Sequence, residues 1–156
     1  MPANKVKDFL DRHSIKYVTI SHSAAYTAQE IAKSAHIPGR ELAKTVILEI
    51  DGHMAMAVLP AHEQILFAEL RNAVAAKRLR LATEEEFKHA FPGCEPGAMP
   101  PFGNLYGMEV YVSADLAEDE QIAFNAGSHT ELVKMAYADF ERLVRPKILE
   151  FAVIAS

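Results

Sequence analysis

The sequence of 156 residues has few of the features that mark specialised classes of protein. Its only cysteine is Cys94, which rules out an internal disulfide bond, so we expect a reducing, cytoplasmic location. No apolar run approaches the ~20 residues of a membrane-spanning helix, and the charged start of the chain is unlike a secretory signal. We therefore expect no membrane association and a single globular domain over residues 1–156.

Motifs for metals, nucleotides and a nucleophilic serine are also missing. The seven histidines include no H-x-x-x-H pair and there is no C-x-x-C, so no metal or other cofactor is expected. Neither "GAMPPFG" nor "GREL" matches a phosphate-binding loop, and prolines deprive the first of backbone amides. A catalytic pair of Ser128 and His129 is discounted, because neighbours in a strand point to opposite faces and no G-x-S-x-G turn is present.

The charge balance argues against a DNA-binding protein. The formal net charge is −5, whereas nucleic-acid-binding domains are more often basic. Local patches matter more than the total, so the balance does not decide against RNA. The basic stretches "AAKRLRLA" and "ERLVRPK" are each interpreted as solvated charge at helix ends.

Apolar periodicity and capping patterns predict the helices. Thr27 with Glu30, and Thr83 with Glu86, have the spacing of a capping box, in which each side chain satisfies an orphan amide of the first turn. The predicted helices span residues 4–13, 27–37, 63–76, 83–91 and 137–146.

Alternating and β-branched runs predict the strands, and two of these runs flank Asp51-Gly52, a dipeptide that tolerates positive φ in a tight turn. This hairpin is apolar enough to form the middle of a sheet. The predicted strands cover residues 15–20, 43–50, 53–60, 79–82, 109–113, 121–127 and 130–136, with 147–154 as a closing strand or an apolar tail. Because strands cluster instead of alternating with helices, we predict an α+β fold with a mixed, mostly antiparallel β-sheet flanked by helices.

Residues 92–107, "PGCEPGAMPPFGNLYG", hold most of the chain's glycine and proline residues, a density that no regular element survives. A long structured loop in a compact domain is usually functional. Elsewhere, Lys44 lies at the start of an otherwise apolar strand. Its ammonium is either a solvated strand end or a group directed into the mouth of a pocket.

Three segments in this order, "ELAKTVIL", "GAMPPFGNLYG" and "FNAGSHTELVKMAYADFERLV", together resemble the YbaK/prolyl-tRNA synthetase-associated domain family. The resemblance covers residues 4–146. It implies a trans-acting enzyme that hydrolyses the ester bond of mischarged aminoacyl-tRNA without a metal, a cofactor or a protein nucleophile. The implied partners are mischarged tRNA and, further, prolyl-tRNA synthetase or another synthetase.

The resemblance also implies roles for particular residues. Lys44 matches the family's lysine near the terminal adenosine and its phosphate, and Gly127 and His129 match a late Gly-x-His; these three are the catalytic candidates. Backbone amides of the two later segments are expected to stabilise the oxyanion, and His129 to orient the substrate amine or a water. The substrate-binding candidates are Thr45, Gly97, Ala98, Pro101, Phe102, Gly103, Asn125 and Ser128.

The sequence does not decide which amino acid is removed from the tRNA. The cysteine-directed branch usually has a serine-proline step where this chain has Pro100-Pro101, and it does not carry the histidine found at His129. Alanine, serine or threonine esters are therefore at least as plausible as cysteine esters on tRNA(Pro). The alternatives are a non-catalytic module that binds tRNA or a synthetase, and a small-molecule hydrolase or sensor that uses the same pocket.

Overall fold

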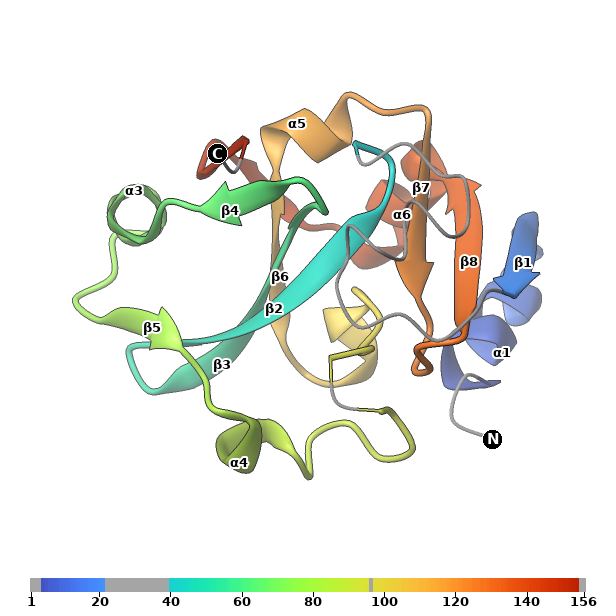
Figure 1. The fold of residues 1–156 in the computed structure, drawn as a ribbon, viewed down its shortest axis with the longest axis horizontal. Helices are drawn as coiled ribbons and strands as arrows, with labels where there is room; N and C mark the ends of the chain where they lie inside the picture. Colours follow the sequence, from blue (N-terminus) through green and yellow to red (C-terminus); the bar gives the residue numbers. More distant parts are fainter. Residues whose placement is uncertain (1–3, 22–39, 96, 155–156) are drawn as a thin grey trace.

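The structure is a computed structural model that describes residues 4–21, 40–95 and 97–154 (Figure 1). The helix predicted over residues 27–37 lies outside these ranges. The helices are α1 (Asn4–Arg12), α3 (Phe67–Ala73), α4 (Glu84–Phe87), α5 (Ala114–Ala117) and α6 (Tyr137–Val144), with one 3-10 turn, η1 (Gly103–Leu105). The strands are β1 (Tyr17–Ser21), β2 (Ala43–Ile50), β3 (His53–Pro60), β4 (Glu63–Ile65), β5 (Leu79–Leu81), β6 (Glu109–Ser113), β7 (Gln121–Asn125), β8 (Glu131–Ala136), β9 (Lys147–Leu149) and β10 (Ala152–Ile154).

The hairpin β2–β3 forms the middle of a five-stranded sheet with the order β5-β2-β3-β6-β9, as predicted. At its turn, Asp51 and Gly52 have φ values of 47° and 89°, the pair of positive values that a type I′ turn needs. β2 pairs antiparallel with β3 and β5, whereas β6 runs parallel to both β3 and β9. The predicted class, α+β with mixed and mostly antiparallel pairing, is confirmed.

A second sheet has three strands, and among the described residues one isolated bridge joins it to the first sheet. Its strands β1, β8 and β7 pair antiparallel in that order. The bridge pairs Leu42, just before β2, with Ala123 of β7 in parallel, and the Ala123 amide donates to the Glu41 carbonyl at 2.9 Å. β4 and β10 form a separate pair, so the strands of the described ranges divide among three sheets.

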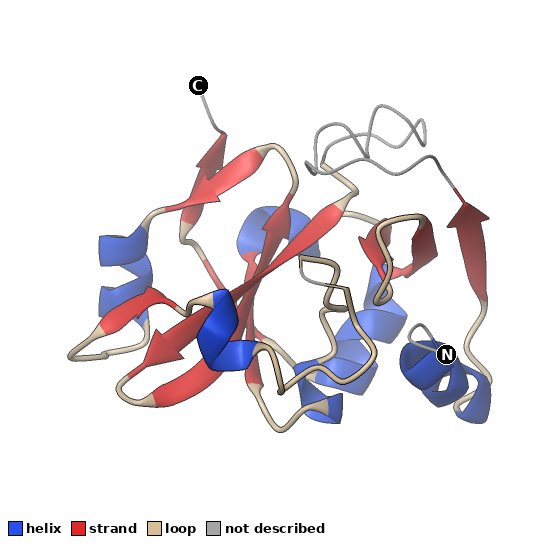
Figure 2. Cartoon of the chain, turned by 60° about the horizontal axis from the view of Figure 1, so that its bottom comes forward, coloured by secondary structure: helices blue, strands red, loops and turns tan. Residues whose placement is uncertain are grey.

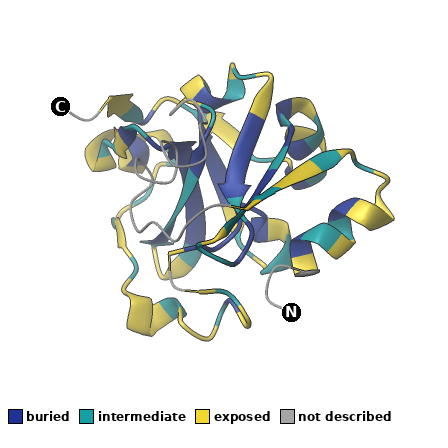
Figure 3. Ribbon diagram, turned by 45° about the vertical axis from the view of Figure 1, so that its right-hand side comes forward, coloured by how far each residue is buried: buried dark blue, intermediate teal, exposed yellow. Residues whose placement is uncertain are grey.

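The main core lies on one face of both large sheets. Ala43 and Ile47 of β2 face this core, as do Ile122 and Phe124 of β7, because alternate residues of a strand share a face. Figure 3 shows the buried residues gathered on the central strands and the exposed ones on the outer helices and turns. A smaller cluster covers the other face of the five-stranded sheet, and its buried members are Leu48, Ala55, Ala57, Leu59, Leu70, Tyr111 and Phe151.

Some element boundaries differ from the prediction. Residues 63–65 form β4 and not the first turn of a helix, because Ile65 pairs with Ala152 of β10 far along the chain. The helix that follows starts only at Phe67. Residues 147–154 form two short strands, and Tyr111 of β6 pairs with Lys147 of β9. The described residues of the glycine- and proline-rich loop are irregular except for η1 (Figure 2). The short helix α5 was not predicted.

Candidate active site

Two backbone hydrogen bonds join the wall loop, residues 92–107, to the β7–β8 turn, residues 126–130. The Gly127 amide donates to the Ala98 carbonyl at 2.8 Å, and the Glu95 amide donates to the Gly127 carbonyl at 2.8 Å. Gly127 has a φ of 102°, a conformation that side chains rarely adopt. Two segments far apart in the sequence are thus fixed side by side, and they bring the predicted residues Ala98 and Gly127 together.

His129 lies directly against the wall loop. A Cβ added to Gly97 would be 3.3 Å from His129 Cε1 and 3.7 Å from His129 Nε2. The imidazole ring therefore faces Gly97 on the side where other residues carry a side chain. The His129 amide also donates to Glu95 Oε2 at 3.3 Å. The sequence analysis did not single out Glu95, although its place in the wall loop made it a candidate. Gly97 and His129 therefore form one structural unit with a carboxylate beside it.

Lys44 and Asn125 lie on the same side of the bridged strands. The parallel bridge between Leu42 and Ala123 sets the register, and two residues further along, Lys44 and Asn125 leave their strands on one face, opposite the main core. Both residues are half-buried. Burial lowers the pKa of Lys44, and the negative charge of Glu63 partly opposes this shift. The sheet register thus places Lys44 beside the end of β7, from which the β7–β8 turn departs.

Several predicted substrate contacts belong to the core instead. Phe102 is completely buried, with its ring centroid 5.4 Å from that of Phe124 and 5.5 Å from that of Phe140, so it packs the core and is not on a pocket surface. A Cβ on Gly103 would be 2.6 Å from the Met108 carbonyl oxygen, which explains this glycine by close packing.

Two other predicted residues lie on the side of the main core. Thr45 shares its face of β2 with Ala43 and Ile47, which belong to the main core, and Lys44 is on the opposite face. Pro101 is buried beside the core residue Phe102. Pro101, Phe102 and Gly103 are thus buried, whereas Thr45 is half-buried on the core face of β2.

The local geometry of Ser128 corrects one premise of the sequence analysis. Ser128 and His129 lie in a turn and not in a strand. The Ser128 hydroxyl pairs with the Thr130 hydroxyl at 2.9 Å and accepts a hydrogen bond from the Thr130 amide at 3.2 Å. These hydrogen bonds stabilise the turn, so Ser128 has a structural role there.

Backbone hydrogen bonds exclude two amides from the expected oxyanion donors. The Gly127 amide donates to Ala98, and the Ala98 amide donates to the Glu95 carbonyl at 3.0 Å. Because each amide has a single hydrogen, these two do not serve a substrate oxygen.

Cys94 and Arg80, the latter from the first basic stretch, each interact with neighbouring side chains. Cys94 is half-buried with its Sγ 3.7 Å from the Tyr106 hydroxyl, and burial raises the pKa of the thiol, which disfavours the reactive thiolate. Arg80 is held by Glu49 at 2.7 Å and by Glu86 at 2.6 Å. The Thr83–Glu86 capping box is present as predicted. The charge of Arg80 is therefore largely neutralised within the protein.

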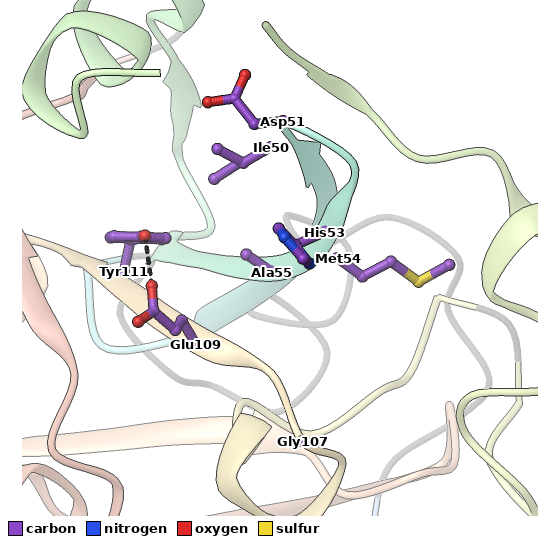
Figure 4. Close-up of a pocket in the computed structure, with 8 residues that line it drawn as sticks. All are labelled: Ile50, Asp51, His53, Met54, Ala55, Gly107, Glu109 and Tyr111. Atoms are coloured by element: carbon purple, nitrogen blue, oxygen red, sulfur yellow. Dashed lines mark hydrogen bonds between the residues drawn. The ribbon is translucent and has the colours of Figure 1, made fainter. Parts of the chain in front are cut away.

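A different cleft, of about 430 Å³, lies at the hairpin end of the five-stranded sheet (Figure 4). Within the cleft, the Tyr111 hydroxyl donates a hydrogen bond to Glu109 Oε2 at 2.7 Å. The Asp51 carboxylate accepts hydrogen bonds from the Lys77 and Arg78 amides. Its lining residues are Ile50, Asp51, His53, Met54, Ala55, Gly107, Glu109 and Tyr111. It contains none of the predicted site residues.

The ranges 4–21, 40–95 and 97–154 contain no group of three or more His, Cys, Asp or Glu residues placed to hold a metal ion. Within the same ranges, no helix has the length and apolar character needed to cross a membrane.

Comparison with known proteins identifies the class. A family model described as the aminoacyl-tRNA editing domain matches residues 22–143, which is most of the chain. The protein therefore belongs to the aminoacyl-tRNA editing domain family, and the resemblance stated from the sequence is confirmed. This membership makes it a hydrolase of the aminoacyl-tRNA ester bond.

Individual relatives agree with this class. The chain is 24% identical over 147 residues to the multifunctional Ser/Thr-tRNA deacylase ProXp-y of Escherichia coli K12, covering 91% of this chain and 87% of the relative. It is 30% identical over 89 residues to the proline–tRNA ligase of Staphylococcus aureus strain Newman, covering 57% of this chain and 15% of the ligase. The similarity to the ligase is thus confined to a small part of that enzyme.

Solved structures share the fold at low sequence identity. A crystal structure of a candidate trans-editing enzyme for prolyl-tRNA synthetase has a TM-score of 0.83 and 18% identity, covering 97% of each chain. A crystal structure of a hypothetical protein has a TM-score of 0.84 and 16% identity, covering 96% of this chain and 99% of the other. At these identities the likeness establishes the fold.

Proposed function

We propose that this editing protein acts in trans on tRNA that carries a small polar amino acid, with serine and threonine as the preferred residues. Support comes from the E. coli relative, which is named for serine and threonine and matches over nearly its whole length. We propose tRNA(Pro) as the tRNA to test first, because part of the chain is similar to a proline–tRNA ligase. Prolyl-tRNA synthetase is accordingly the proposed partner.

One observation supports the proposed site: a Cβ added to Gly97 would lie 3.3 Å from His129 Cε1, so the imidazole faces this glycine. The hydrogen bonds of Gly127 hold the two segments in that position. A side chain on the wall loop at this point would fill the space beside the imidazole. The bare glycine therefore allows the imidazole to lie close to the wall loop.

The proposed reaction is hydrolysis of the aminoacyl ester. A water oxygen bonds to the ester carbonyl carbon, the bond from that carbon to the ribose oxygen breaks, and the water's proton ends on the departing ribose hydroxyl. His129 orients the water or the substrate amine, which removes the entropic cost of bringing the reactants together. Amides such as that of Gly97 stabilise the oxyanion, and Lys44 binds the phosphate of the terminal nucleotide as a point cation.

The test is a deacylation panel. The protein is incubated with Ser-, Thr-, Ala- and Cys-tRNA(Pro), and loss of the esterified amino acid is followed with time. We expect Ser- and Thr-tRNA to be hydrolysed fastest. Equal rates with all four esters would contradict the proposed preference. Binding of tRNA without any ester loss would favour the alternative of a non-catalytic binding module.

Substitutions assign the roles. His129→Ala should lower kcat/KM by about 10²-fold, the cost of misplacing a reacting group by about 1 Å. The matched control His89→Ala removes an exposed histidine of the loop after α4 and should leave the rate unchanged. Lys44→Met keeps the apolar stem and removes the charge, so it should raise KM for tRNA and flatten the salt dependence. An unchanged rate in His129→Ala would remove the imidazole from the mechanism.

A further inference from the structure

A second pocket, outside the proposed active site, lies between β4, α5 and β10. It has a volume of about 470 Å³. Its polar lining consists of Arg40, His62, Glu63, Asp115, Glu118 and Asp119, so four carboxylates face one guanidinium. None of the residues around Gly97 and His129 lines this pocket. We refer to it as the β4–α5 pocket.

Glu63 is a buried carboxyl group with one unpaired oxygen. It is 3% exposed, and its Oε1 has no hydrogen-bond partner within the described ranges. Ser113 and Asp115 interact with the group, and burial, followed by the effect of Asp115, raises the pKa of Glu63 to about 7. The positive charge of Lys44 offsets only part of this effect. Because an unsatisfied buried acceptor is costly, a donor or cation in the pocket would be favoured here.

Asp119 is a second carboxyl group with a raised pKa and an unpaired oxygen. Burial, followed by the charge of Glu41, raises the pKa of Asp119 to about 6, and Arg40 and His62 counter this only in part. Its Oδ2 has no hydrogen-bond partner within the described ranges, and neither does His62 Nδ1. The pocket therefore has two separate acceptor groups, each with a like charge next to it: Glu63 beside Asp115, and Asp119 beside Glu41 and Glu118.

The wall supplied by β10 is apolar and open. Ala152, Val153 and Ile154 line the pocket, and the last two are 41% and 67% exposed. A surface of this kind suits a methylene chain, just as the stems of lysine side chains lie along apolar surface while their ammonium groups reach polar partners. The described residues contain no cluster placed to hold a metal ion, so a compact divalent cation does not match the pocket.

From these features we infer that the β4–α5 pocket binds a linear diamine or polyamine. One protonated amine pairs with Glu63 and Asp115, a second pairs with Asp119 and Glu118, and the methylene chain between them lies on β10. An ammonium group has three N–H donors, so each end can satisfy an unpaired carboxylate oxygen and a further acceptor. The charge of Lys44, a residue of the proposed active site, reaches Glu63, so the pocket adjoins that site, but the inference does not require deacylase activity.

Isothermal titration calorimetry of the full chain tests it, with 1,4-diaminobutane and spermidine as probes at constant ionic strength. We expect saturable binding of one molecule per chain. Butylamine has the same methylene chain with only one amine and should bind at least tenfold more weakly. Magnesium chloride should not displace the diamine. Equal binding of butylamine and the diamine, or displacement by magnesium, would show a non-specific counterion effect and overturn the inference.

Variants locate the binding. Glu63→Gln and Asp119→Asn keep the shape of each side chain, and each should weaken diamine binding at least tenfold. Glu85→Gln removes the same charge from the exposed surface of α4, where Glu85 pairs with Lys88, and should leave binding unchanged. Circular dichroism checks that the variants are folded. If both pocket variants bind the diamine as well as Glu85→Gln does, the pocket is not the site.

Discussion

Replacing Gly97 with alanine is the sharpest test of the proposed active site. The new Cβ would lie 3.3 Å from His129 Cε1. Carbon atoms in good contact are ~3.5–4.0 Å apart, so the imidazole has to move by roughly 0.2–0.5 Å. A displacement of about 1 Å in a catalytic centre costs about 100-fold in rate, so we expect kcat/KM for deacylation to fall by about three- to tenfold.

Backbone strain has to be separated from this effect, and the chain offers a matched control. Gly97 has a φ of +83°, and a left-handed alanine costs roughly 1–2 kcal/mol. Gly52 has a φ of +89° and no atom within 4 Å of an added Cβ. Gly52→Ala should therefore lower the free energy of unfolding by a similar amount while the deacylation rate is unchanged.

The assay is the initial rate of ester loss from Ser- and Thr-tRNA, measured beside urea unfolding of each variant. In a His129→Ala background, Gly97→Ala should slow the reaction no further, because the ring that it displaces is absent. Three results would refute the reasoning: no slowing by Gly97→Ala, equal slowing by Gly52→Ala, or a full additional effect in the His129→Ala background.

Three other predictions concern stability, measured by urea unfolding. Phe102→Ala should lower the free energy of unfolding by about 3–5 kcal/mol, because this ring fills the main core, and a loss below about 1 kcal/mol would contradict its buried position. Thr83→Ala should lower it by about 1 kcal/mol through loss of the capping box at α4, whereas Thr83→Ser should retain most of it. For Glu63, the folded pKa of about 7 lies above its ordinary value of 4.5, so the folded chain binds more protons between these values and stability falls as pH rises through that window. The free energy of unfolding of Glu63→Gln relative to the native chain should therefore rise between pH 5 and pH 8. The rise should be at most about 3 kcal/mol, and less where solvent screens the charge. The same difference at both pH values would contradict the pKa shift.

Local patterns predicted those parts of the fold whose stabilising contacts lie close in the sequence. The Asp51-Gly52 turn adopts the positive φ values that the dipeptide allows, and β2 and β3 pair across it. The Thr83–Glu86 box forms as predicted because its two hydrogen bonds join residues three apart. The residues 63–65 were wrongly predicted as helix, since their partner strand, β10, lies near the other end of the chain.

The candidate site was predicted in part. Gly97, Ala98, Gly127 and His129 do lie together, and their grouping followed from the family resemblance and not from spacing or periodicity. Phe102 illustrates the limit: an aromatic residue in a glycine- and proline-rich loop has no periodic pattern around it, so the sequence could not distinguish a pocket wall from a core contact.

The sequence by itself determined the class of fold, the central hairpin, the Thr83–Glu86 cap and, through three ordered segments, the family. Only the tertiary structure decided that Lys44 and Asn125 share a face, that Gly97 supports the ring of His129, and that Glu63 is buried among carboxylates. The physical reason is the range of the interactions. Caps and tight turns are stabilised by residues a few positions apart, whereas these juxtapositions depend on register and burial set by strands that meet only when the whole chain has folded.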